Sequence, residues 1–239
     1  MMIMMIEDEA ALREVVEYNL SREGYQVNAF DNANDALIAV EDCPPDLVLL
    51  DLMLPGLQGL QFLDIFRQKD QKTPVIIISA RTSEEDIIRA LERGADDYLP
   101  KPFSLKLLET KVKVALRRIS GENTNVGFFN SGGVSVEIEA HKVICDNAEL
   151  QLTQKEFDLL ALFIRKPGKV FTRNQLLNII WGYENDVNSR TVDVHMAMLR
   201  KKLGDKGRYI KTLPKIGYLW EARLVENTTK TKTSDNNDQ

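Results

Sequence analysis

Five side chains able to handle a phosphate group or a metal ion stand where short apolar runs end in the first half of the sequence. They are Glu7 and Asp8 after Met2–Ile6, Asp51 after Leu47–Leu50, Ser79 at the end of Val75–Ser79, and Lys101 after Tyr98 and Leu99. Clustered carboxylates repel one another unless a hard cation joins them, and Mg²⁺ suits such oxygen ligands. An aspartate beside Mg²⁺ and a lysine is also a competent phosphoryl acceptor, because both cations stabilise charge on the transferring group.

The apolar runs alternate with longer amphipathic segments, which predicts a doubly wound α/β domain with a five-stranded parallel sheet. The run Leu47–Leu50 is apolar without alternation, as a strand buried on both faces should be. The expected strands are Met2–Ile6, Tyr25–Phe30, Asp46–Leu50, Val75–Ser79 and Tyr98–Leu99, and the expected helices are Ala10–Glu23, Ala33–Asp42, Gly59–Lys69, Ser83–Arg93 and Ser104–Arg118. Because the carboxyl ends of parallel strands form the ligand crevice, the five polar side chains should converge there.

Four motifs in the first half resemble the receiver domain of two-component response regulators, which has a flavodoxin-like fold. The motifs are Ile6–Glu9, Leu49–Gly56, Ile78–Arg81 and Gly94–Phe103, and the resemblance covers residues 1–118. The site residues that it implies are Asp51 as phosphoacceptor; Glu7, Asp8, Asp51 and the Met53 carbonyl for Mg²⁺; and Ser79, Tyr98 and Lys101 for phosphate binding and switching. It also implies a cis peptide bond between Lys101 and Pro102.

The resemblance further implies a face through which two receivers dimerise. Its residues are Ile87, Asp96, Asp97, Leu107, Lys111 and Arg118. The family usually carries a Lys–Glu pair at the positions of Ile87 and Leu107. We therefore hypothesise that the apolar pair makes dimerisation less dependent on phosphorylation.

A different organisation follows residues 119–127, a polar segment that we expect to be a linker. Short strand-like pieces fill Phe128–Leu152, and helices are expected from Thr153, from near Thr172 and from near Ser189. Thr153 and Glu156 have the spacing of a capping box, and Tyr209–Ala222 has the pattern of a β-hairpin. We assign residues 128–225 to a second domain and expect the polar residues 226–239 to be a disordered tail.

A basic stretch lies near the end of an otherwise acidic chain. Residues 1–120 hold 14 Lys and Arg against 21 Asp and Glu, whereas Arg190–Arg223 holds nine basic and three acidic residues. In this stretch Val192, Met196, Leu199 and Leu203 share one helical face, which leaves basic residues on the opposite face. A helix of this kind fits the major groove of DNA, where its cations also neutralise phosphates.

Residues 150–220 resemble the winged-helix domain of OmpR/PhoB-type regulators, an α+β fold that binds DNA. The matching motifs are Leu152–Leu160, Val170–Leu177, Ile180–Gly182, Ser189–His195, Leu199–Gly204 and Ile216–Tyr218. The expected DNA-binding residues are Arg190, Thr191, Val194, His195, Met198, Arg200, Lys201, Lys202 and Lys215. The family often has basic residues at Ala197 and Met198 and an Arg-Gly at Pro214-Lys215, so its sequence preference is not carried over. The resemblance also implies that a loop around Trp181–Asn188 faces RNA polymerase.

The composition is typical of a globular protein. Hydrophobic residues make up 44% of the 239 residues, yet no apolar run approaches the roughly 20 residues of a membrane-spanning helix. The apolar start Met1–Ile6 is short and lacks the basic flank of a signal peptide. Cys43 and Cys145 lack the spacing of metal ligands and are expected to be reduced. We therefore expect a soluble cytoplasmic protein.

These patterns favour a transcription regulator and not an enzyme. In this hypothesis a sensor histidine kinase phosphorylates Asp51 in a Mg²⁺-dependent reaction, and the phosphorylated receiver forms a homodimer that binds paired half-sites in double-stranded promoter DNA. One alternative is an atypical regulator that dimerises constitutively. Another is a Mg²⁺-dependent phosphohydrolase with Asp51 as nucleophile, although such enzymes generally place a second Asp where Met53 stands.

Overall fold

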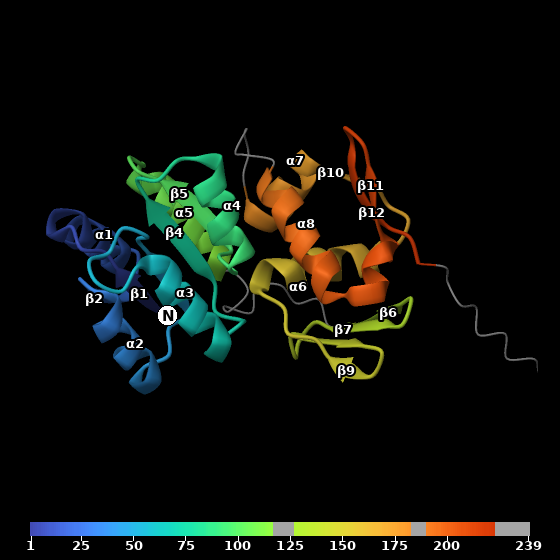
Figure 1. Cartoon of the computed structure of the whole chain (residues 1–239), viewed down its shortest axis with the longest axis horizontal. Coiled ribbons are helices and arrows are strands. Elements are labelled where there is room, and N and C mark those ends of the chain that lie inside the picture. Colours follow the sequence, from blue (N-terminus) through green and yellow to red (C-terminus); the bar gives the residue numbers. More distant parts are fainter. Residues whose placement is uncertain (117–126, 183–189, 223–239) are drawn as a thin grey trace, which may run out of the picture.

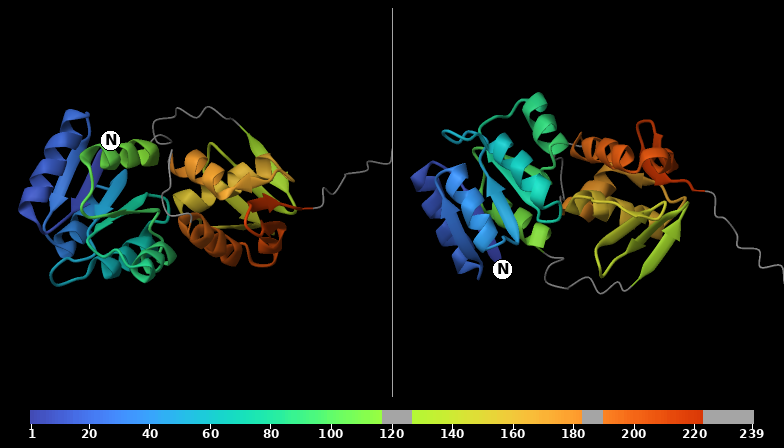
Figure 2. Two further views of the ribbon diagram at one scale, coloured as in Figure 1. Left: turned by 90° about the horizontal axis from the view of Figure 1, so that it is seen from above. Right: turned by 60° about the horizontal axis from the view of Figure 1, so that its bottom comes forward.

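The computed structural model of the chain describes residues 1–116, 127–182 and 190–222. These residues form two domains that lie side by side in all the views (Figures 1 and 2), with α4 (Glu84–Glu92) and α5 (Leu105–Leu116) on the side of the first domain that faces the second. The expected linker at 119–127, apart from Gly127, and the expected tail at 226–239 lie outside the described residues. In the described part of the chain, no helix is long and apolar enough to cross a membrane.

The N-terminal domain is a parallel sheet of five strands in the order β2-β1-β3-β4-β5, with helices between consecutive strands. The strands are β1 (Met2–Ile6), β2 (Gln26–Phe30), β3 (Leu47–Leu50), β4 (Val75–Ser79) and β5 (Asp97–Pro100), and the remaining helices are α1 (Ala10–Arg22), α2 (Ala33–Asp42) and α3 (Gly59–Lys69). The doubly wound fold and the sequence-based element bounds are therefore confirmed to within two residues at each described end.

Alternating residues of the central strands supply two apolar cores, one on each face of the sheet. Along β1, Met4 and Ile6 belong to one buried cluster, whereas Ile3 and Met5 belong to the other. Every residue of β3 and β4 is buried, because helices cover both faces of the sheet. This double cover fixes the strand register, and with it the positions of the polar residues that follow each strand.

The C-terminal domain places three helices between a small antiparallel sheet and a β-hairpin. The sheet has the order β6-β7-β8-β9, and the hairpin strands β11 and β12 pair with the short strand β10. The elements are β6 (Phe128–Ser131), β7 (Val134–Glu137), β8 (Lys142–Cys145), β9 (Ala148–Glu149), α6 (Gln154–Arg165), β10 (Phe171–Thr172), α7 (Arg173–Leu176), the π-helical turn η1 (Leu177–Trp181), α8 (Arg190–Lys202), the 3₁₀ turn η2 (Gly204–Tyr209), β11 (Ile210–Leu213) and β12 (Gly217–Trp220).

The expected helix starts and the hairpin of this domain are confirmed. The Thr153 N–H donates to the Glu156 carboxylate at 2.8 Å, which supplies the Glu156 half of the capping box at the start of α6. Thr172 accepts a hydrogen bond from the N–H of Gln175 and so begins the helix that was expected near it. The four apolar residues expected to share one face of α8 are all buried in the core of the domain.

A polar cluster holds α8 against the rest of the C-terminal domain. Arg173 Nε and the Tyr218 hydroxyl donate to the same Asp193 oxygen, at 2.7 and 2.6 Å. Burial and the neighbouring carboxylate of Asp193 together raise the pKa of Tyr218 to about 12. This cluster and the apolar back of α8 give the helix one orientation relative to the hairpin.

Candidate functional site

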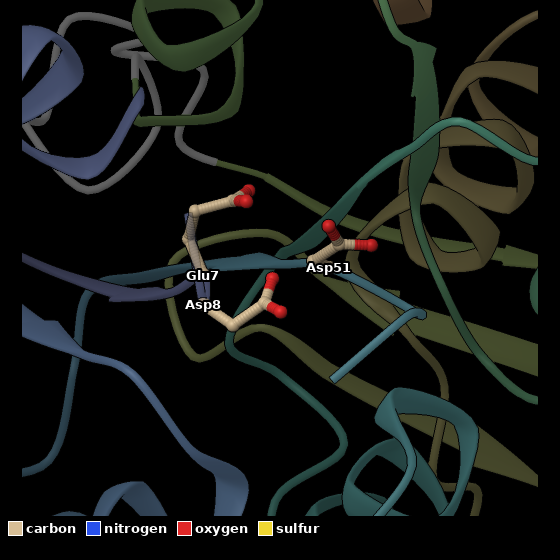
Figure 3. A group of neighbouring side chains, drawn as sticks. All are labelled: Glu7, Asp8 and Asp51. Atoms are coloured by element: carbon tan, nitrogen blue, oxygen red, sulfur yellow. The ribbon is translucent and has the colours of Figure 1, made fainter. Parts of the chain in front are cut away.

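Three carboxylates meet at the carboxyl edge of the parallel sheet (Figure 3). Glu7 and Asp8 follow β1, and Asp51 follows the neighbouring strand β3. One oxygen of each carboxylate lies within 4.8 Å of the other two. Glu7 and Asp51 are buried, whereas Asp8 is exposed, so the cluster opens to solvent on the Asp8 side. The convergence expected from the strand order is therefore present in the structure.

The ammonium group of Lys101 lies between two of these carboxylates. Its Nζ donates to both oxygens of Glu7, at 2.7 and 2.8 Å, and to Oδ2 of Asp51 at 2.6 Å. Burial lowers the pKa of Lys101, but the hydrogen bonds to Asp51 and Glu7 outweigh it and raise that pKa overall. Burial raises the pKa of Glu7 even though Lys101 opposes this. Lys101 therefore stays protonated and positively charged beside Asp51.

The backbone around Asp51 fixes how its carboxylate points. The Met53 N–H donates to Asp51 Oδ1 at 2.8 Å, which leaves Oδ2 for Lys101. The start of α3 comes so close that a Cβ on Gly59 would lie 2.1 Å from the carbonyl oxygen of Asp51. Since no other residue has room there, Gly59 lets α3 pack directly beneath the loop that carries Asp51.

Ser79 and Tyr98 lie next to each other on the β4–β5 side of the cluster. Ser79 is fully buried, and its Oγ accepts a hydrogen bond from the Arg81 N–H at 3.3 Å. Tyr98 is buried too, and its hydroxyl donates to the Arg81 carbonyl at 2.5 Å. Burial raises the pKa of Tyr98, so the phenol stays protonated. The peptide bond between Lys101 and Pro102 is cis, as the receiver resemblance implied.

Most residues expected on the dimer face are engaged within the chain. Asp97 and Lys111 form a buried ion pair at 2.8 Å, and Asp96 is 1% exposed. Ile87 is half-buried and packs against the core cluster of the N-terminal domain, whereas Leu107 is exposed. Arg118 lies outside the described residues.

The nine residues expected to bind DNA differ strongly in exposure. Arg190, Lys201 and Lys215 are exposed, and Lys215 stands in the β11–β12 turn. Thr191 and His195 are buried, and Val194 packs against the core cluster of the N-terminal domain. Met198, Arg200 and Lys202 are half-buried, as is Val194. Arg200 donates to Ile210 O and Thr212 Oγ1, and Lys202 donates to Glu156. The predicted loop around Trp181–Asn188 lies outside the described residues from 183 on.

Sequence reasoning missed two arginines that support these sites. Arg13 Nη1 donates to the backbone oxygens of Glu7 and Asp8, at 2.6 and 3.2 Å, and so steadies the turn that carries both carboxylates. Arg67 is 5% exposed and donates to Asp96 at 2.8 Å. Neither role has a local signal, because a basic residue on an amphipathic helix is usually solvated.

Comparisons with known proteins match both halves of this architecture. Residues 3–113 match the response regulator receiver domain family, and residues 147–220 match the family described as transcriptional regulatory protein, C terminal. The chain is 40% identical to the phosphate regulon transcriptional regulatory protein PhoB of Klebsiella pneumoniae, with 93% of this chain and 98% of that protein aligned. It is 37% identical to the DNA-binding response regulator MtrA of Mycolicibacterium smegmatis, with 90% and 95% aligned.

Similarity to a solved structure extends over both domains together. The structure of a point mutant of RitR has a TM-score of 0.74 at 26% identity and covers 92% of this chain and 99% of its own. A receiver joined to a C-terminal DNA-binding domain defines the class of DNA-binding transcriptional response regulators. Within that class, the chain belongs to the OmpR/PhoB-type response regulators.

Proposed function

We propose that Asp51 is the phosphoacceptor of this regulator and that a sensor histidine kinase is the phosphodonor. The observation that carries this proposal is the Lys101 ammonium shared between Asp51 and Glu7 at 2.6–2.8 Å. Transfer would form a P–O bond to the Asp51 carboxylate and break the P–N bond of the kinase phosphohistidine. Lys101 would stabilise the charge on the transferring group, and Ser79 would hydrogen-bond one of its oxygens.

The residues around Asp51 also fit a Mg²⁺ ion. Three carboxylates with oxygens within 4.8 Å of one another, one of them exposed, are hard ligands open to solvent on one side. We assign the ion to Glu7, Asp8, Asp51 and the backbone carbonyl of Met53. When bound, Mg²⁺ would neutralise negative charge on the phosphoryl group, which Lys101 alone neutralises only in part.

Tyr98 and Ser79 are the proposed switch. Ser79 is buried at the end of β4, the strand beside β3, and Tyr98 is buried on the next strand, β5. If Ser79 turns toward the phosphoryl group, the packing around the Tyr98 ring and its bond to the Arg81 carbonyl change with it. Such a two-state side chain links the chemistry at Asp51 to the α4–β5–α5 side of the domain.

At its output the regulator would place α8 in the major groove of double-stranded promoter DNA. The nine expected residues would make the contacts, with Lys201 and Lys215 neutralising phosphates. Phosphorylated receivers would form a homodimer through the face defined above, so that two effector domains occupy paired half-sites. We further propose that RNA polymerase is a partner and that the protein works in the cytoplasm, as a promoter-binding regulator would.

The phosphohydrolase alternative has less support than the regulator. Met53 stands where aspartyl-phosphate enzymes generally carry a second acid, and its backbone N–H already donates to Asp51. The family to which the chain belongs consists of transcription regulators. Steady turnover of a phosphomonoester that Asp51→Ala abolishes would overturn this preference.

The mass of the intact protein tests the proposed acceptor. After incubation with Mg²⁺ and a small phosphodonor, the parent should gain one phosphoryl group, whereas Asp51→Ala should gain none. Omission of Mg²⁺ should suppress the gain in the parent. Equal gain by the parent and Asp51→Ala would show that another residue accepts the group and would remove Asp51 from the proposal.

A further inference from the structure

A cavity of about 510 Å³ lies between the two domains and is lined by residues of both. Its receiver wall comes from Pro45 and Asp46, which precede β3, and from Thr73 and Pro74, which precede β4. These residues lie at the amino ends of the strands, whereas Asp51 follows the carboxyl end of β3. Ligand pockets in proteins span roughly 300–1,000 Å³, so the cavity is large enough for a small organic molecule.

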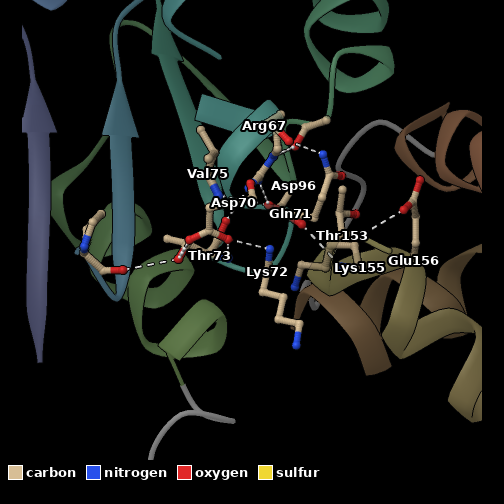
Figure 4. Close-up of polar contacts among 12 residues, drawn as sticks. Arg67, Asp70, Gln71, Lys72, Thr73, Val75, Asp96, Thr153, Lys155 and Glu156 are labelled. Atoms are coloured by element: carbon tan, nitrogen blue, oxygen red, sulfur yellow. Dashed lines mark hydrogen bonds and ion pairs between the residues drawn. The ribbon is translucent and has the colours of Figure 1, made fainter. Parts of the chain in front are cut away.

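The receiver wall is held in one conformation by its own hydrogen bonds (Figure 4). The Asp70 carboxylate accepts from the N–H groups of Lys72 and Thr73, at 2.7 and 2.9 Å, and from the Thr73 hydroxyl at 2.6 Å. The Thr73 hydroxyl also lies 3.3 Å from the carbonyl oxygen of Pro45, which ties the two loops of the wall together. Pro45 and Pro74 are buried and restrict the backbone further. This wall is therefore formed before any ligand arrives.

The wall that the C-terminal domain supplies is mostly apolar. Phe157, Ala161 and Leu162 of α6 line it, together with Ile180 of η1. The ring of His141, in the turn between β7 and β8, stacks on Phe157 with the ring centroids 3.6 Å apart. Such a wall favours a ligand with a hydrophobic body, because the contact removes apolar surface of both partners from water.

The charges around the cavity favour a cation inside it. Asp158 of α6 lines the cavity and is 4% exposed, and its carboxylate accepts from the Gln154 amide at 3.1 Å. The lining residues Lys72 and Arg165 are exposed, and the Arg165 guanidinium lies over the Phe129 ring at 5.5 Å. A buried carboxylate is stabilised by a cation that comes beside it, whereas a second anion there would be costly.

We infer that this cavity binds a small organic cation with an apolar body, an arylalkylamine, with its ammonium group at Asp158 and its ring against Phe157. Two further lining carboxylates, Asp46 and Glu139, add to the negative charge of the lining. Because the ligand contacts both domains, it gives the regulator a chemical input separate from phosphorylation of Asp51.

Three indole compounds of nearly equal size test the inference in the unphosphorylated full-length protein, so the result does not depend on the proposed phosphoacceptor. Tryptamine carries an ammonium group, tryptophol a hydroxyl group and indoleacetate a carboxylate. Ligand-observed NMR titrations should show that tryptamine binds roughly ten-fold more tightly than tryptophol, because it adds a charge to a hydrogen bond with a carboxylate. Indoleacetate should bind more weakly than both. Equal binding of the three compounds, or binding of none, would overturn the inference.

Two carboxylate variants locate the site. Asp158→Asn keeps the shape of the side chain but removes its charge, so it should weaken tryptamine binding by about ten-fold and leave tryptophol binding nearly unchanged. Asp205→Asn removes an exposed carboxylate outside the cavity lining and should bind tryptamine like the parent. In a Trp220→Phe background Trp181 is the only tryptophan, and its Nε1 donates to the Asp96 carbonyl at 2.9 Å. Its emission therefore checks that each variant keeps the two domains joined.

Two exposed lysines give a second test that does not change a buried residue. Lys72→Gln removes a cation from the cavity lining and should tighten tryptamine binding by about two-fold, because a repulsion is lost. Lys106→Gln removes an exposed cation outside the lining and should leave the affinity unchanged. Equal tryptamine affinities of these two variants would overturn the inference. The same conclusion would follow if Asp158→Asn kept both the Trp181 emission and the tryptamine affinity of the parent.

Discussion

Replacing Lys101 by methionine should destabilise the receiver by about 2–3 kcal/mol in the absence of a divalent cation. Lys101 Nζ lies 2.6 Å from Asp51 and 2.7 and 2.8 Å from the two oxygens of Glu7, and both carboxylates are almost completely buried. Removing one partner of a fully buried ion pair costs roughly 3–5 kcal/mol. The Lys101 side chain is 17% exposed, so solvent screens part of the interaction and the expected loss falls just below that range, to about 2–3 kcal/mol.

The thermal unfolding midpoint of the full chain, followed by calorimetry with and without Mg²⁺, measures this effect. Lys113→Met is the matched control: it removes an ammonium group from an exposed pair with Glu23 and should leave the midpoint nearly unchanged. Mg²⁺ should recover more stability in Lys101→Met than in the parent, because the cation replaces the missing charge. Asp51→Asn should likewise recover part of the loss, since it removes one of the two unpaired carboxylates.

Equal midpoints for Lys101→Met and Lys113→Met without Mg²⁺ would refute this electrostatic account. The same conclusion would follow if Asp51→Asn made Lys101→Met less stable still. Either result would mean that the carboxylates of Glu7 and Asp51 are stable in this site without the Lys101 ammonium. The acidic edge, the three carboxylates of Glu7, Asp8 and Asp51, would then not depend on Lys101 for its stability.

Acidification should weaken the contact between α8 and the receiver through His195. Its Nδ1–H donates to Thr191 O at 2.8 Å, and its Nε2 is buried without a hydrogen-bond partner among the described residues. Burial lowers the pKa of His195, and the Lys155 ammonium adds to this, although the carboxylates of Asp96 and Glu156 oppose it. The contact between α8 and the receiver should be complete above the ordinary histidine pKa of about 6.5 and should weaken as the pH falls below it. Trp181 emission in the Trp220→Phe chain should follow this change. If a His195→Phe variant kept the same pH dependence, another group would be responsible for it. Lys201→Ala should weaken DNA binding similarly for all sequences, and it should lower the slope of log affinity against log salt concentration by about one. Lys206→Ala removes a cation already paired with Asp146 at 3.0 Å and should change this slope less. Equal slopes for the two variants would exclude a phosphate contact by Lys201.

The elements of the receiver and its acidic edge could be predicted from sequence because both depend on local patterns. A fully apolar run such as Leu47–Leu50 specifies a central strand, and the residue after it, Asp51, must then lie at the carboxyl edge. The apolar back of α8 could be predicted equally well, since Val192, Met196 and Leu199 repeat at helical spacing.

The contacts between the two domains could not be predicted in this way. The Asp96 carboxylate accepts from the backbone N–H of Lys155, 59 residues away, and its carbonyl accepts from Trp181 Nε1, 85 residues away. No periodicity connects these residues. The burial of Thr191 and His195 was also outside local reasoning. His195 packs edge-on against Trp181, which lies elsewhere in the same domain, with ring centroids 5.1 Å apart, and no local pattern links the two residues.

The measurement that tests the account most directly is Trp181 emission in the Trp220→Phe chain before and after treatment with Mg²⁺ and a small phosphodonor. The account predicts a shift to longer wavelength that follows the fraction of phosphorylated protein, and no shift when Asp51→Asn is added. A chain whose mass shows full phosphorylation of Asp51, but whose Trp181 stays as buried as before, would contradict the link between the acidic edge and the recognition helix.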